Sequence, residues 1–261
     1  MRAHLPSEHL DAWDHYHLAV RHMYRYNKHD NNIAARHFEK ALVLDPEFAR
    51  ASSGLSYTEF QNAFQHFGSD GEHHRKLAVA HAERALMLDP LDPFCNLMYG
   101  RVKWLIGEPE DALIWVNNAI DANPNYAFGY FNRATLQNAL CNGERAEENA
   151  AVAVQLSPID PHLQSMFGTR AFAAFLSGND ASAVHYAERA MTAPNPHLYV
   201  YTIAAQIFDK CGAPDKARQR NEMVRYRNYR FGKTDFLRHN AMLGNPELKS
   251  QLNVTLGRLG L

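Results

Sequence analysis

The sequence predicts an all-α fold, a right-handed solenoid of about six helix pairs closed by a C-terminal helical cap. The phrase Ala-Leu-x-Leu-Asp-Pro occurs at 41–46 and again at 85–90. Weaker copies end at Pro124 and Pro158, so that two successive steps from Pro90 are both 34 residues. Small residues recur at fixed places between these prolines. A fixed period of this length is typical of a helical repeat array, in which each unit buries its apolar face against its neighbours.

The third repeat, 93–124, shows the pattern of one unit. Gly100 is the small residue of its first helix, and Gly107 ends that helix because glycine accepts the left-handed backbone of a C-terminal cap. Ala112 and Ala119 lie seven residues apart and therefore on one face of the second helix. The closing proline ends the second helix, since it lacks an N–H group and clashes with the preceding turn.

The same small positions return in the later repeats at 127–158, 161–195 and 198–228. They are Ala134, Ala146, Ala150 and Ala153 in the fourth repeat, Gly168, Ala183, Ala187 and Ala190 in the fifth, and Ala205, Gly212 and Ala217 in the sixth. These spacings predict helix pairs throughout this part of the chain.

The first two repeats, 8–46 and 49–90, are less regular. A first helix is expected from about Glu8 to Tyr26 with Ser7 as its N-cap, followed by a polar link over 27–32. The second repeat carries about ten extra residues around 67–74. They are read either as a loop on a functional rim or as a long loop after a lengthened helix.

The repeat period ends after Tyr229, and residues 229–261 are interpreted as capping helices that follow an array over 1–228. Thr234 is expected to cap a short helix. Asn245 followed by Pro246 has the form of an N-cap and a first helical proline, which predicts a last helix to about Leu259.

Over about 11–226 the chain resembles the tetratricopeptide repeat (TPR) family, on the small-residue, glycine and proline positions given above. A narrower resemblance links 5–16, 35–41, 48–57 and 245–248 to the repeat region of bacterial class III adenylate cyclases and winged-helix transcription regulators. In that group the repeats are thought to sense or bind something and pass the state to an effector. This sequence has neither a cyclase nor a winged-helix segment, so the resemblance implies no output activity. It implies either an excised relative or an adaptor that works alone.

Composition narrows the function class. The formal net charge of −1 gives no global attraction to nucleic acid or to anionic membranes. The three cysteines, Cys95, Cys141 and Cys211, are widely spaced and are expected to be reduced thiols. No signal peptide and no run of about 18 apolar residues is found. We therefore expect a cytoplasmic, bacterial protein without a nucleic-acid or membrane partner, and a homo-oligomer stays open.

No residue pattern indicates catalysis, a cofactor or a metal. Nucleophile elbows, phosphate-binding glycine loops, dinucleotide fingerprints and zinc motifs are absent from the sequence. Eleven of the fifteen histidines precede Ala82, but none are spaced three or four apart as helical metal ligands are. A site between helices and a pH response of the first repeats stay open. The basic stretch from Arg218 to Lys233 is interpreted as a solvated face rather than as a phosphate or acidic-partner site.

The concave face of the array is the predicted binding surface, lined by the first helix of each pair. The predicted contact residues are Arg50, Ser53, Tyr57, Phe60, Phe94, Leu97, Arg101, Trp104, Phe128, Phe131, Asn132, Thr135, Asn138, His162, Ser165, Thr169, Phe172, Tyr199, Thr202 and Gln206. Aromatic and arginine anchors dominate binding energy at interfaces. For each aromatic residue, packing on the next repeat is an equal alternative. The sequence thus predicts a scaffold that binds a peptide or protein in bacterial signalling. The alternatives are a module that senses a small-molecule effector and a secretion or assembly chaperone.

Overall fold

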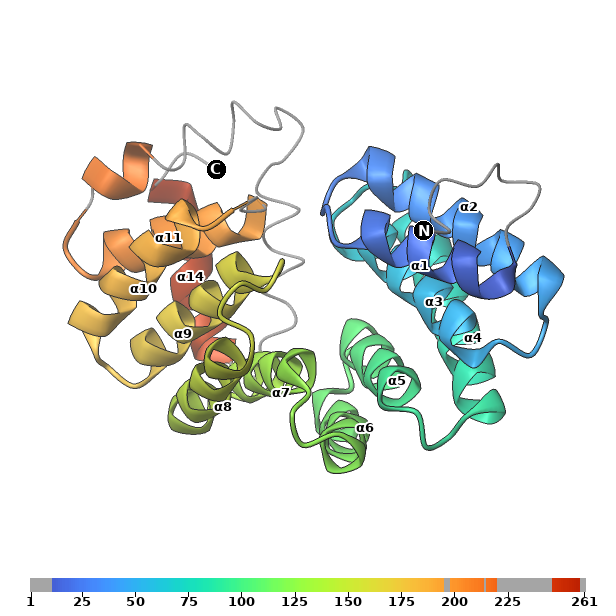
Figure 1. Ribbon diagram of the computed structural model, residues 1–261. Coiled ribbons are helices and arrows are strands. Elements are labelled where there is room, and N and C mark those ends of the chain that lie inside the picture. The colour runs from blue at the N-terminus through green and yellow to red at the C-terminus, as the bar shows by residue number, and fades with distance from the viewer. Residues whose placement is uncertain (1–10, 195–197, 214, 220–245, 259–261) are drawn as a thin grey trace. The chain divides into compact units, whose positions relative to one another are not determined.

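The computed structural model describes residues 11–194, 198–213, 215–219 and 246–258, and these residues form helices joined by short turns, without a β-strand (Figure 1). The chain divides into two compact units, Met1–Pro124 and Asn125–Leu261, which are described separately. Thr234, Val224 and most of the basic stretch from Arg218 to Lys233 lie outside the described residues.

The first unit contains three helix pairs, in which each helix packs against the next. Its helices are α1 (Ala12–Met23), α2 (Lys28–Leu44), α3 (Ala49–Phe64), α4 (Gly71–Leu88), α5 (Pro93–Leu105) and α6 (Pro109–Ala122). First helices of neighbouring pairs also contact each other, α1 with α3 and α3 with α5. This two-layer stacking of helix pairs is the architecture of an α-solenoid.

The second unit repeats the arrangement with α7 (Ala127–Ala139), α8 (Gly143–Leu156), α9 (Leu163–Leu176), α10 (Asp180–Thr192) and α11 (Leu198–Lys210). Here α7 contacts α9, and α9 contacts α11. The last described helix, α14 (Pro246–Arg258), begins at the predicted Pro246 and packs on α11. Whether α14 serves as a cap stays a prediction.

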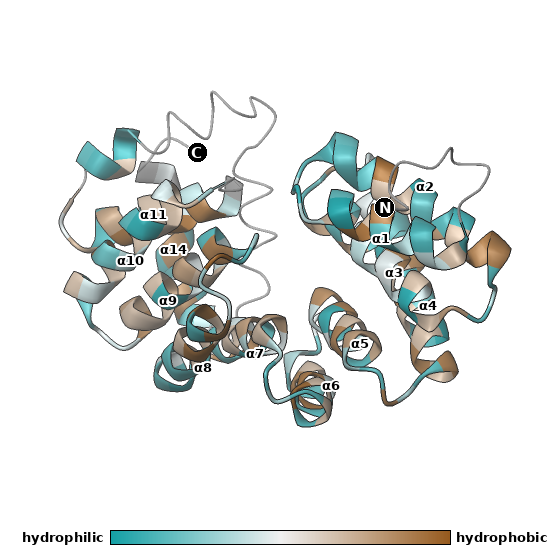
Figure 2. Ribbon diagram, viewed as in Figure 1, coloured by the Kyte–Doolittle hydropathy of each residue, from teal (hydrophilic) through white to brown (hydrophobic). Residues whose placement is uncertain are grey.

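Alanine at helical spacing brings the two helices of each pair close together. In α2 and α4 the inward residues include Ala34, Ala41, Ala78 and Ala82, all fully buried. In α8 Ala146 is equally buried. Figure 2 shows apolar and polar residues mixed along single helices, as expected when one face is buried and the other is exposed.

A left-handed residue follows the first helix of every pair in the described chain. The residues with positive φ are Tyr26, His66, Gly107, Cys141, Gly178 and Gly212. Glycine was predicted to end the helix at Gly107, where φ is +92°. At Tyr26, His66 and Cys141 the same turn is made by residues with a Cβ atom, which costs about 1–2 kcal/mol per left-handed residue.

Two sequence-based expectations about the first repeat are wrong. The N-cap of α1 is Asp11 rather than Ser7, because Asp11 and Asp14 each accept a hydrogen bond from the other's backbone N–H in a capping box. The polar segment after α1 is not a long link. Asn27 caps α2 through its side chain, which accepts from the backbone N–H of Asp30, so the segment is already the first turn of that helix.

The extra residues of the second repeat lengthen its helices and leave a short loop. The helix α3 continues to Phe64, and α4 begins at Gly71 with Asp70 as its N-cap. An ion pair between Glu59 on α3 and His74 on α4 joins the two extensions. Because most of the insertion is helical, it stiffens the second pair instead of forming a free rim loop.

Candidate partner-binding surface

Four of the predicted contact residues of the first unit come together between α3 and α5. The rings of Phe60 and Trp104 stack with their centroids 6.1 Å apart. The guanidinium carbon of Arg101 lies 4.1 Å from the ring centroid of Phe60 and 5.6 Å from that of Tyr57. Cation–π contacts of this kind contribute about 0.5–2 kcal/mol each, more when they are shielded from water. All four side chains are buried, so these rings pack on the next repeat, the alternative left open for each aromatic residue.

The edge of this cluster carries an unsatisfied donor. The indole Nε1 of Trp104 is buried and has no hydrogen-bond acceptor among the described residues. Phe64, a half-buried residue that the sequence analysis did not select, packs on Trp104 with a centroid distance of 5.5 Å. A buried N–H group without an acceptor costs about 1–3 kcal/mol. The end of α5 therefore offers a donor beside an aromatic wall.

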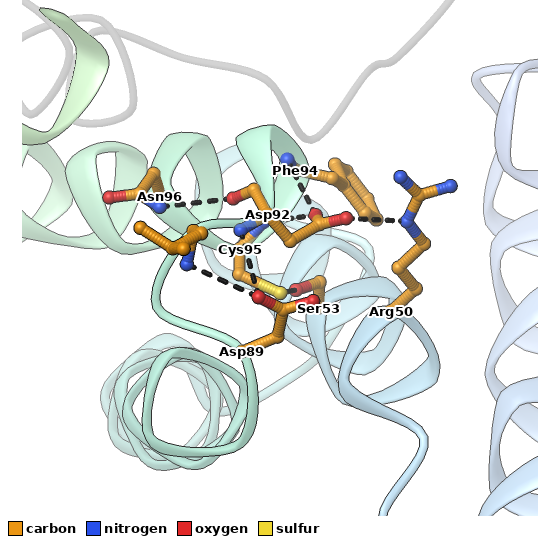
Figure 3. Close-up of polar contacts among 8 residues, drawn as sticks. Arg50, Ser53, Asp89, Asp92, Phe94, Cys95 and Asn96 are labelled. Carbon is orange, nitrogen blue, oxygen red and sulfur yellow. Dashed lines mark hydrogen bonds and ion pairs between the residues drawn. The ribbon is translucent and has the colours of Figure 1, made fainter. Parts of the chain in front are cut away.

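Arg50 connects α3 to the start of α5 (Figure 3). Its Nε donates to Oδ2 of Asp92 over 2.6 Å, and the hydrogen bond from this carboxylate raises the pKa of the guanidinium. The other oxygen of Asp92 caps α5 by accepting from the backbone N–H groups of Phe94 and Cys95. Arg50 keeps 45% of its side chain exposed, and Phe94 is half-buried. Both are accessible at the rim of the first-helix layer.

The second unit builds a comparable cluster between α7 and α9 from Phe128, Phe131 and His162. The centroid of the His162 ring lies 4.5 Å from that of Phe128 and 6.2 Å from that of Phe131. The two phenylalanines are 8% exposed and His162 is 1% exposed, so these rings also pack on the next repeat. Asn132 is turned onto its own helix, because its Nδ2 donates to the backbone oxygen of Phe128 over 2.7 Å.

Asn138 links the same two helices at a position 34 residues after Trp104. Its Nδ2 donates to the backbone oxygen of Thr169 over 2.9 Å, while its Oδ1 is buried without a donor among the described residues. Thr135 and Thr169 are half-buried and stand next to this amide. The end of α7 thus presents an unsatisfied acceptor where the end of α5 presents an unsatisfied donor.

The remaining predicted residues do not join these clusters. Phe172 is 8% exposed and packs against Phe175 of its own helix, with centroids 6.1 Å apart. Tyr199 is 3% exposed. Gln206 donates from Nε2 to the backbone oxygen of Leu252, so α14 already occupies this end of the first-helix layer. Ser53, Leu97, Ser165 and Thr202 are buried.

A histidine cluster between α1 and α2 was missed by the sequence analysis. Nδ1 of His15 and Nδ1 of His37 are 2.9 Å apart, and the ring of His22 stacks on His37 with centroids 6.3 Å apart. His22 is held by Asp30, 2.6 Å from its Nδ1. Spacing within one helix could not reveal this cluster, because it brings together residues 22 positions apart on two helices. The excess of histidine in the first repeats was the available signal.

Nothing in the described residues resembles a catalytic or metal centre. No three His, Cys, Asp or Glu side chains gather there as metal ligands would. Burial raises the pKa of Cys95 to about 12 and that of Cys211 to about 11, so neither thiol is an activated nucleophile. In the same residues, no helix is long and apolar enough to cross a bilayer.

Comparisons with known proteins identify the fold. The sequence matches no protein-family model and no curated protein. PilW, described as a widely conserved type IV pilus biogenesis factor, is 17% identical over 85% of this chain and 94% of its own, with a TM-score of 0.59. TTC0263 of Thermus thermophilus, described as a thermophilic TPR protein, is 17% identical over 72% of this chain and 99% of its own, with a TM-score of 0.58. The Cut9–Hcn1 hetero-tetramer of the APC/C matches with 12% identity over 95% of this chain and 42% of the matched chain, with a TM-score of 0.67.

Identities this low speak for the fold alone. The prediction of an α-solenoid of TPR-type helix pairs is confirmed. The narrower resemblance to the repeats of cyclases and winged-helix regulators stays a prediction.

Proposed function

We propose that this protein is a non-catalytic scaffold that binds a peptide or protein partner along the concave layer of its first helices. The observation that carries the proposal is the pair of unsatisfied polar atoms, Nε1 of Trp104 and Oδ1 of Asn138. They occupy the same place in two successive repeats. A peptide backbone offers both a carbonyl oxygen for the donor and an N–H group for the acceptor, so one extended partner matches both atoms.

The accessible neighbours of these atoms suit such a partner. Thr135 and Thr169 are half-buried and flank Asn138, while the guanidinium of Arg50 is exposed at the rim of the first unit. The aromatic rows behind them are held rigid by packing between repeats, which limits the conformational entropy lost on binding. Reaching the two buried atoms requires the side chains that cover them to move aside, so binding combines a preformed wall with local rearrangement.

Structural neighbours that work in assemblies support this direction. PilW is described as a pilus biogenesis factor, and Cut9 is seen in a hetero-tetramer with Hcn1. By resemblance we place the present scaffold in bacterial regulation within the cytoplasm. One observation favours the small-ligand alternative, a cavity beside α2 that is treated in the next section.

The first test locates the partner on the surface. A photo-crosslinking amino acid at Thr135 or Thr169 should trap the partner in a native lysate, whereas the same group at Glu148, exposed on the second helix α8, should not. Equal trapping at both places would move the binding surface elsewhere.

The second test uses the captured partner at known concentration. Trp104→Phe removes the indole N–H and keeps an aromatic ring, and the loss of one hydrogen bond should weaken binding by about fivefold to tenfold. Trp115→Phe on α6 is the matched control and should bind like the parent. If Trp104→Phe binds as tightly as Trp115→Phe, Nε1 plays no part in recognition.

A further inference from the structure

A cavity of about 230 Å³ lies along one face of α2. The described residues that line it are Ile33, Arg36, His37 and Lys40. Their spacing of three, four and seven residues places them on a single face of the helix. At about 30 Å³ per water molecule, the volume corresponds to roughly seven or eight waters, which suits a small ligand rather than a peptide.

The cations at this cavity have no carboxylate to balance them. Arg36 and Lys40 are exposed and form no ion pair with any described residue. The nearby buried carboxylate, Asp30, is already held by His22, Arg25 and Asn27. The two charged residues of α3 are also engaged elsewhere, Arg50 with Asp92 and Glu59 with His74.

The imidazole of His37 lies within this positive field. Burial, His15, Lys40, His22 and Arg36 together lower its pKa to about 4. The pKa of His15 is also lowered, by burial and Lys40, against the opposing charges of Asp14 and Asp11. Every charged or titratable group that acts on His37 is therefore a cation or can become one.

The contact between His15 and His37 limits how protons can be added. With the two Nδ1 atoms 2.9 Å apart, one nitrogen donates and the other accepts, so the pair shares a single proton. A second proton would set two N–H groups against each other. An anion in the adjacent cavity would supply the missing negative charge and favour the doubly protonated pair.

We propose that the cavity beside α2 is a binding site for a small, doubly charged oxyanion, namely a phosphate group, free or carried on a small organic molecule. Arg36 and Lys40 hold its charge at the rim, and His37 adds a charge when the pH falls. The site lies on a second helix and uses none of the residues of the proposed partner-binding surface. It therefore stands or fails independently of the proposed scaffold function.

Sulfate is the first probe, because it keeps two charges throughout the pH range of the test. Its affinity for the full chain is measured by calorimetry at constant ionic strength, at about pH 5.5 and about pH 7.5. If bound sulfate returns the pKa of His37 from about 4 to its ordinary 6.5, the affinity should be about tenfold higher at the lower pH.

Three variants test the roles of the residues. Arg36→Gln/Lys40→Gln should weaken sulfate binding at least about fivefold. Arg21→Gln/Lys28→Gln removes the same charge from exposed positions of the same helix pair and should bind like the parent. His37→Gln should bind sulfate with little dependence on pH. Circular dichroism confirms that each variant is folded.

Several results would overturn the proposal. These are equal affinity at the two pH values, equal loss in both double variants, or no heat of binding with about 20 mM sulfate at the lower pH. Inorganic phosphate and glycerol 3-phosphate then distinguish the source of the group. Tighter binding of the ester assigns the site to a phosphorylated organic molecule, equal binding assigns it to the free ion, and binding of neither excludes a phosphate site.

Discussion

Two glycines at the same place in the repeat have different roles in the two units. Gly100 on α5 and Gly168 on α9 are separated by two periods of 34 residues. A Cβ atom on Gly100 would lie 2.9 Å from a methyl group of Val116 and 3.0 Å from the backbone oxygen of Ala112. A Cβ atom on Gly168 would meet Val200 at 3.8 Å, an ordinary contact. A shared repeat letter therefore marks tight packing in the first unit and none in the second.

The chemistry between first helices differs in the same way. In the first unit the permanent cation of Arg101 lies over Phe60. In the second unit the titratable ring of His162 lies on Phe128, with its Nδ1 3.1 Å from a carboxylate oxygen of Asp160. The repeat fixes where a side chain stands, whereas its neighbours decide which interaction it makes.

The largest expected effect comes from the glycine pair. Gly100→Ala should lower the free energy of unfolding by about 1–3 kcal/mol, because the added methyl group overpacks against backbone and Val116. Gly168→Ala should raise it by about 0.5–1 kcal/mol, because alanine favours the helix and fits the space. Urea denaturation of both variants beside the parent gives the values. A change of the same sign at both positions would remove the contrast between the units.

The next effect is a pH dependence that belongs to the first unit. Since burial and nearby cations lower the pKa of His37 to about 4, the unfolded chain takes up this proton at higher pH than the folded chain. Stability should therefore fall as the pH drops from about 6.5 toward 4, by about 1 kcal/mol once solvent screening is included. His37→Asn should flatten this part of the curve.

His185→Asn is the control for that experiment. His185 is exposed on α10 in the second unit, and its replacement should leave the profile unchanged. An acid-induced loss of stability that persists in His37→Asn would show that another group is responsible.

The smallest effect concerns the left-handed turns. Gly107→Ala should destabilise the first unit by about 1 kcal/mol, because its backbone has φ +92°. Cys141→Gly should stabilise the second unit by at most about 0.5 kcal/mol, because relief of the left-handed strain is partly offset by the greater entropy of the unfolded glycine. Thermal melts of the two variants measure the shifts. No stabilisation by Cys141→Gly would mean that contacts of the cysteine side chain outweigh its strain.

The sequence by itself determined the fold class and most of the helices. Repeated small residues can be read without a structure because each repeat packs only on its neighbours, so local spacing carries the architecture. The start of α14 followed from Asn245 and Pro246 for the same local reason. Ser7 and the supposed link after Tyr26 were misjudged because several polar residues competed as caps, and only backbone geometry chose Asp11 and Asn27.

The tertiary structure decided which side chains are accessible and which groups share a proton. The period placed Phe60, Trp104 and Phe128 on first helices, but the distance between successive helices determines that these rings are buried. It likewise determines that His15 meets His37 and that Gly100, unlike Gly168, has no room for a methyl group. Sequence spacing gives direction around one helix, whereas burial, hydrogen bonding and pKa depend on the atoms contributed by the neighbouring helices.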